Sequence, residues 1–112
     1  MRVGRPLICL GVACTLATLD GTRGLHAHGW PDPPAWWTAA AMCVHRHESP
    51  DWHQHGYYSG GFQFLDSTWR AVGGRGRAGD HTRAEQTYRA WLLYCEVGWA
   101  AWPITSRLCG LR

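Results

Sequence analysis

Residues 35–64 read AWWTAAAMCVHRHESPDWHQHGYYSGGFQF, and the fold can be predicted outward from this stretch. Its first half, residues 35–49, predicts a helix, because Pro34 suits a helix start and Pro50 ends it. Side chains at spacings of three and four are expected to share one face of this helix. That face consists of Trp36, Ala40, Cys43, Val44 and His47. Glu48 follows on the last turn, beside that face, where its carboxyl group can project into a cleft.

The second half of the stretch contains too many glycines for a helix and too many aromatic residues for a disordered loop. Residues 56–64 therefore predict a turn followed by a short extended piece or a small hairpin. Gly60 and Gly61 would let the backbone come close to a ligand, because glycine carries no side chain.

The remainder of the chain predicts two more helices. Residues 66–72 form a short helix with Asp66 or Ser67 as its cap, and residues 73–80 form a flexible loop. Thr82 and Glu85 make a T-x-x-E capping box, which begins an amphipathic helix that Gly98 ends. An irregular tail follows. The predicted fold is a small, mainly helical α+β domain.

The N-terminus has the composition of a secretory signal peptide. Arg2 and Arg5 precede an uncharged apolar run at residues 7–19, and small residues lead to a cleavage site after Ala27. We therefore predict a signal peptide over residues 1–27, with an uncleaved anchor as the alternative. Residues 28–34 form a proline-rich leader, and residues 35–112 form the domain.

Charge and cysteine content narrow the classes of function. Net charge is +3, and removing residues 1–27 takes away three arginines and one aspartate, which leaves +1. This small net charge does not indicate nucleic-acid binding, which usually requires a cluster of basic residues on one face. Cys43, Cys95 and Cys109 remain after cleavage, and an odd number in an exported protein predicts one disulfide and one spare thiol.

One interpretation of the residues around Glu48 is a metal site, because His45, His47, His53 and His55 surround it. Zinc binds imidazole readily. The spacing nevertheless differs from H-E-x-x-H, which places two histidines one helical turn apart. Side chains two positions apart on a helix point away from each other. The sequence therefore predicts neither a metal nor another cofactor, and a secreted metal-binding protein stays as an alternative.

The other interpretation makes Glu48 a general acid for cleaving a glycosidic bond. An apolar surrounding keeps a carboxylic acid protonated near neutral pH, because it makes the charged form costly. A sugar also needs flat aromatic faces and hydrogen-bonding groups along a groove, and Gln63 offers an amide. The candidate faces are Trp52, Tyr57, Tyr58, Phe62, Phe64 and Trp69.

Several short motifs follow one another in a specific order. They are Glu48-Ser49, Trp52, Gly56-Tyr57-Tyr58, GGFQF at 60–64, STWRAVGG at 67–74, RAEQ at 83–86 and AWP at 101–103. In this order the chain resembles the transglycosylase-like domain of the resuscitation-promoting factors of actinobacteria. The resemblance covers residues 36–109.

The resemblance implies a lysozyme-like fold and a secreted, cell-wall enzyme that cleaves peptidoglycan. It places the catalytic acid at Glu48. The implied substrate-binding residues are Tyr58, Gln63, Trp52, Trp69 and Thr68. It also implies a disulfide between Cys43 and Cys109, with Cys95 as a buried free thiol. A pair between Cys43 and Cys95 is the alternative.

The chain also departs from the family pattern. Four residues separate Cys43 from Glu48, whereas better-known members place the cysteine directly before the glutamate; four residues are about one helical turn. Pro50 and Asp51 replace two glycines, and Ser59 interrupts the tyrosine and glycine run. These changes bear on affinity and substrate preference.

The sequence leaves the outcome of the reaction open. Nothing in the sequence requires a second catalytic carboxylate beside Glu48. The enzyme could therefore be a lytic transglycosylase or a muramidase. A non-catalytic peptidoglycan-binding module is the further alternative. No protein partner can be predicted, and no membrane association is expected after cleavage of the signal peptide.

Overall fold

The computed structural model describes residues 29–112, so the predicted signal peptide lies outside the described residues. The described part is mainly helical, as predicted. Its helices are α3 (Ala35–Glu48), α4 (Asp66–Ala71), α5 (Arg83–Val97) and α6 (Pro103–Leu108), with short 3-10 helices η2 (Ala78–Asp80) and η3 (Gly98–Ala101). Within residues 29–112, no helix combines the length and the apolar character that crossing a membrane requires.

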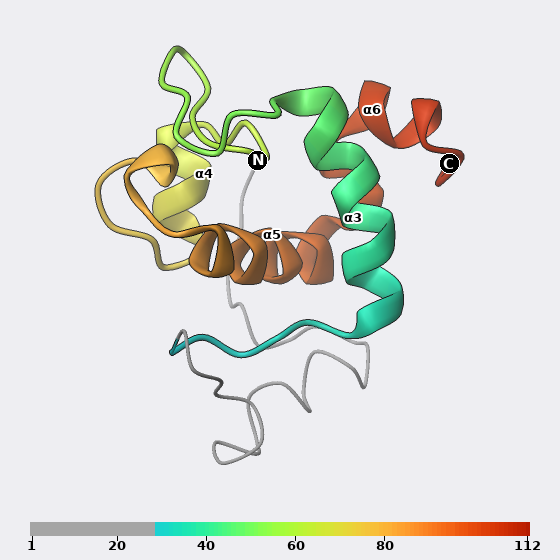
Figure 1. The fold of residues 1–112 in the computed structure, drawn as a ribbon, viewed down its shortest axis with the longest axis horizontal. Helices are drawn as coiled ribbons and strands as arrows, with labels where there is room; N and C mark the ends of the chain where they lie inside the picture. Colours follow the sequence, from blue (N-terminus) through green and yellow to red (C-terminus); the bar gives the residue numbers. More distant parts are fainter. Residues whose placement is uncertain (1–28) are drawn as a thin grey trace.

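The long helices α3 and α5 form the frame of the domain. Figure 1 shows α4 and the loop after α3 at one end of α5, and α6 beside the C-terminal half of α3 at the other. Helix α6 also packs against α3. Segments from the two ends of the described chain therefore meet near the residue that ends α3, Glu48.

Helix α3 buries a different face from the one predicted. Its buried residues are Trp37, Ala41, Val44 and His45, whereas Trp36 is 58% exposed and His47 is exposed. The predicted face is therefore wrong: the buried face is shifted by about one residue toward the C-terminus. Glu48 lies four residues after Val44, so it continues the buried face rather than flanking it. This register explains why its side chain points inward at the end of the helix.

The core is built largely from aromatic rings. Trp37 lies at its centre, stacked on Trp99 at a centroid distance of 5.8 Å and packed edge-on against Trp91 at 5.4 Å. Large aromatic side chains bury much apolar surface each, which helps so small a domain to build a core. The buried apolar residues are Trp37, Ala41, Val44, Phe62, Phe64, Trp69, Val72, Ala78, Ala90, Trp91, Leu92, Leu93 and Trp102.

The segment between α3 and α4 holds no regular strand. The predicted hairpin is reduced to two isolated antiparallel bridges, His55 with Ser59 and Ser59 with Phe64. Gln63 has φ of 52°, in the left-handed region that residues other than glycine seldom adopt. The segment is an irregular coil that is exposed at residues 55–58 and buried at residues 59–62 and at Phe64.

Gly60 and Gly61 were expected to let the backbone approach a ligand, but in the structure they lie against protein side chains. A Cβ at Gly60 would lie 2.5 Å from Oε1 of Gln86, and one at Gly61 would lie 2.6 Å from the Trp52 ring. Both distances are too short for a real contact. The two glycines therefore let the coil pack tightly onto α5 and onto the end of α3.

Gln86, the last residue of the RAEQ motif, anchors this coil to α5. Its side chain is fully buried. Oε1 accepts a hydrogen bond from the Gly61 N–H at 2.9 Å, and Nε2 donates to the carbonyls of Trp52 and His81, both at 2.9 Å. One side chain thus satisfies three backbone groups that belong to loops.

We expect Gln86→Met to lower the free energy of unfolding by about 3 kcal/mol, because it leaves these three backbone groups without partners. Urea denaturation monitored by tryptophan fluorescence measures the change. Arg70→Met, at an exposed position of α4, is the control and should change stability by no more than about 0.5 kcal/mol. Equal stability of both variants would contradict the anchoring role.

Three other local predictions can now be compared with the structure. Thr82 caps α5 as predicted, because its side chain accepts the Glu85 N–H, but the Glu85 carboxylate pairs with His81 and Arg89 at 3.0 and 2.8 Å. The predicted cap of α4 is wrong: the N-cap residue is Leu65, and no side chain caps it. The predicted irregular tail instead forms η3 and α6.

The cysteines confirm one prediction and contradict another. Cys43 and Cys109 form a disulfide with a Cα–Cα distance of 6.0 Å, as the resemblance implied. Cys95 is half-buried on α5 and is itself disulfide-bonded. The prediction of a free thiol at Cys95 is therefore wrong, and the alternative pair with Cys43 is excluded.

Candidate active site

Glu48 lies at the C-terminal end of α3, half-buried at the wall of a groove. Its Oε2 accepts a hydrogen bond of 2.8 Å from the Thr105 hydroxyl of α6. The groove here has a cavity volume of about 250 Å³. The residues that line it are Glu48, Tyr58, Gln63, Ala101, Trp102, Pro103 and Ile104.

The surroundings of Glu48 change its acidity. Burial raises the pKa of its carboxyl group above the ordinary value, because desolvation disfavours the charged form. The hydrogen bond from Thr105 acts in the opposite direction and is the smaller effect. The net result favours the protonated acid, which is the form that can donate a proton.

A smaller hollow of about 80 Å³ continues the groove inward. It shares Tyr58, Gln63, Ala101 and Trp102 with the cavity at Glu48, so we treat the two as parts of one groove. Thr68 of α4 lines this inner part. The groove thus runs from the end of α3 toward α4.

Three of the predicted substrate-binding residues, Tyr58, Gln63 and Thr68, line the groove, and two do not. Trp69 is 0% exposed, and its indole N–H donates to the Arg75 carbonyl at 2.9 Å. Trp52 stacks on His45 at a centroid distance of 3.9 Å and lines a separate hollow against α5. Neither tryptophan therefore lines the groove at Glu48.

Sequence reasoning missed the C-terminal wall of the groove. Trp102 is buried, and its indole N–H donates to the Phe62 carbonyl at 2.9 Å, which joins the tail to the coil. Ile104 is 72% exposed at the rim. The AWP motif, residues 101–103, was the available signal, because all three of its residues line the groove.

Asp51 and Asp66, the next two aspartates after Glu48 in the sequence, lie outside the groove. Asp51 is exposed, and its Oδ1 accepts the His53 N–H at 2.9 Å. Asp66 pairs with Arg77 through hydrogen bonds of 3.0 and 3.2 Å. Among the described residues, Glu48 is the only carboxylate that lines the groove.

The four histidines around Glu48 do not converge on one point. His45 bonds to the Gly61 carbonyl, His47 to the Cys43 carbonyl and His53 to the Gly79 carbonyl, each through Nδ1 at 2.9–3.0 Å. His55 contacts Ser59 and Asp80 instead. Each ring has its own protein partner, so the geometry does not favour the metal-binding alternative.

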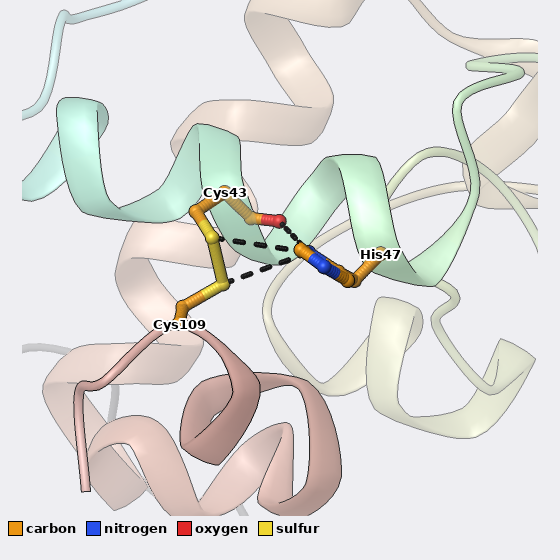
Figure 2. Close-up of side chains that lie close together, drawn as sticks. All are labelled: Cys43, His47 and Cys109. Atoms are coloured by element: carbon orange, nitrogen blue, oxygen red, sulfur yellow. Dashed lines mark hydrogen bonds between the residues drawn. A yellow bond between two sulfur atoms is a disulfide. The ribbon is translucent and has the colours of Figure 1, made fainter.

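One cluster within residues 29–112 has metal-ligand chemistry, and it has another explanation. Cys43, His47 and Cys109 bring their ligand atoms within 4.8 Å of one another. Figure 2 shows that the two sulfur atoms are bonded together, with His47 Nδ1 at 3.8 Å from each. A disulfide cannot supply the thiolates that a metal would bind.

A serine, a histidine and an aspartate also line up near the groove. His55 Nδ1 lies 2.9 Å from the Ser59 hydroxyl, and its Nε2 lies 2.9 Å from Asp80. Ser59 is 0% exposed, and its oxygen accepts the Gly79 N–H at 2.8 Å. A substrate cannot reach that hydroxyl, so the chain of contacts holds the coil against η2.

Fold and groove together define a small helical domain in which one half-buried acid, Glu48, faces a groove with aromatic walls. Residues 34–105, well over half of the chain, match the sequence model of the transglycosylase-like domain. The chain belongs to the transglycosylase-like domain family. The resemblance seen in its motifs is thereby confirmed.

Curated relatives support the same assignment. The chain is 33% identical over 114 residues to resuscitation-promoting factor RpfC of Mycobacterium tuberculosis, covering 98% of this chain and 77% of RpfC. It is 48% identical over 56 residues to resuscitation-promoting factor Rpf of Micrococcus luteus, covering 50% of this chain. The matched region is 25% of that Micrococcus protein, so the chain spans only part of some relatives.

Proposed function

We propose that this protein is a secreted enzyme that cleaves the glycan strands of peptidoglycan. The observation that carries the proposal is the half-buried Glu48 carboxyl in a groove whose walls include Tyr58, Gln63 and Trp102. Membership of a transglycosylase-like family supports the same chemistry. The bond cleaved would join N-acetylmuramic acid to N-acetylglucosamine, and the place of action would be the cell wall.

In the proposed mechanism Glu48 donates its proton to the glycosidic oxygen. The bond to the muramic sugar then breaks, and positive charge develops on that sugar as an oxocarbenium-like centre. Burial supports this role, because it keeps the acid protonated at a pH where an exposed glutamate would be ionised. Tyr58 would provide a flat face for the sugar.

The hydrogen bonds of Gln63 within the protein determine whether it would act as a donor or an acceptor toward the substrate. Its Nε2 donates hydrogen bonds to Gln54 Oε1 at 2.6 Å and to the Gly60 carbonyl at 2.8 Å. Both amide hydrogens are therefore in use. Gln63 would meet a sugar through its oxygen, as an acceptor from a hydroxyl or an acetamido N–H.

The carboxylates of the groove support one stereochemical course over another. A conventional retaining glycosidase holds a second carboxylate about 5 Å from the acid, and the described groove residues include only Glu48. We therefore favour assistance by the substrate's own acetamido group. Attack by its 6-hydroxyl would give a 1,6-anhydro product, as in a lytic transglycosylase.

Mass spectrometry of muropeptides tests the proposal after digestion of purified peptidoglycan. We expect fragments that end in 1,6-anhydromuramic acid, which are 18 Da lighter than the hydrated fragments by loss of one water. Hydrated ends would indicate a muramidase and would reject the transglycosylase outcome alone. Binding to peptidoglycan without new fragments would indicate a non-catalytic module. The assay is run with and without a strong chelator, and we expect equal activity, because no cofactor is proposed.

A further inference from the structure

Helices α3 and α6 are joined at two levels. The disulfide between Cys43 and Cys109 forms one connection, and the hydrogen bond between Glu48 and Thr105 forms the other. Cys43 lies five residues before Glu48, and Thr105 lies four residues before Cys109. Each separation is little more than one helical turn. The disulfide therefore fixes α6 about one helical turn away from the contact between the Thr105 hydroxyl and the Glu48 carboxyl.

From this geometry we infer that Thr105 is a positioning residue for Glu48, held in place by the disulfide one turn away. The inference rests on the proposed function, in which Glu48 is the proton donor. Thr105 is 7% exposed and does not line the groove. It would act on the substrate only through the carboxyl group that it contacts.

The hydrogen bond has a defined direction. The Thr105 hydroxyl donates to Oε2, because a carboxylate has no hydrogen of its own. Oε2 already accepts the hydrogen bond from Thr105. When Glu48 is protonated, Oε1 is therefore the oxygen that carries the acidic proton. The contact thereby selects the oxygen that donates, and it fixes the rotation of the carboxyl group.

Apart from Tyr58, the other titratable groups near Glu48 have their own partners or are exposed to solvent. On α3, His45 bonds to the Gly61 carbonyl and His47 to the Cys43 carbonyl. In the groove, Tyr58 is the other titratable residue. On α6, the side chain of Arg107 is exposed. Thr105 is accordingly the group of α6 that tunes the acid.

Thr105→Val removes the hydroxyl and keeps the branched shape, whereas Thr105→Ser keeps the hydroxyl. The hydrogen bond favours the carboxylate, so its loss should raise the pKa of Glu48. The wild-type rate of wall lysis should fall as pH rises through that pKa, because only the protonated acid donates. In Thr105→Val this fall should move to higher pH, and the maximal rate should drop by about tenfold. Thr105→Ser should restore the wild-type profile.

A second measurement separates this inference from the proposed function. Carbon-detected NMR titration of the Glu48 carboxyl reports its pKa whether or not the protein lyses walls. A higher pKa in Thr105→Val than in wild type supports the inference, even if lysis is absent. An identical pKa and pH profile in the two proteins overturns it, while lysis by wild type would leave the proposed function standing. If Thr105→Val does not fold, Thr105→Cys, with its weaker donor, takes its place in both measurements.

Discussion

Lysis of purified cell walls should be lost when Glu48 is replaced by glutamine. The substitution keeps the size of the side chain and its acceptor for Thr105, but it removes the proton that the mechanism transfers. General acid catalysis contributes about 10²–10⁴-fold to a rate, so a loss of this size is expected. The initial rate of turbidity decrease measures it, with muropeptide analysis confirming that no new ends form.

Asp51→Asn supplies the matched control for Glu48→Gln. It makes the same chemical change at an exposed carboxylate three residues away, outside the groove. We expect near wild-type lysis, because the Asp51 carboxylate serves a local turn with His53. Both variants should still sediment with insoluble peptidoglycan. If Glu48→Gln lyses walls as fast as the parent, the assignment of Glu48 as the acid is wrong.

The limits of the two long helices could be predicted because their end signals are local. Pro34 and Pro50 bracket α3, and Thr82 and Gly98 bracket α5. Which face of α3 is buried could not be predicted as well. Trp36 and Trp37 are adjacent and equally apolar, so periodicity alone does not decide between them. Packing against Trp91, Trp99 and Phe62 buries Trp37 and leaves Trp36 at the edge of the core.

The site could be predicted in part. Glu48, Tyr58 and Gln63 followed from a motif pattern within one short stretch, and the structure brings them to one groove. Thr105 could not be found this way, because its contact with Glu48 spans 57 residues and depends on how α6 packs. The tail offered no clear helical period, and its fold is set by Trp102 and by the disulfide.

Residue type alone also misled the interpretation of the aromatic residues and the glycines. Trp52 and Trp69 have the chemistry of sugar-binding faces, yet one stacks on His45 and the other is fully buried. Gly60 and Gly61 permit a close approach, but the groups that approach are Gln86 and Trp52. In a domain this small, the same residue types build both the core and the groove.

The disulfide should contribute the largest single share of stability. It closes a loop over a sequence separation of 66 residues, for which the chain-entropy relation gives about 4 kcal/mol. Domains of this size are stable by only about 5–15 kcal/mol. We therefore expect the double variant Cys43→Ala/Cys109→Ala to lose roughly 15–30 °C in melting temperature. Calorimetry of the double variant is the cleaner test, because chemical reduction would also break the disulfide at Cys95.

Activity of this double variant tests whether the disulfide acts through Thr105. Below its melting temperature, the variant should retain its core but hold α6 less firmly against α3, so lysis should slow. If the disulfide positions Thr105, adding Thr105→Val should reduce the rate little further, because coupled residues are not additive. Independent roles would instead multiply the two losses. Wild-type lysis by a folded double variant would show that packing of Trp102 and the tail alone keeps Thr105 on Glu48.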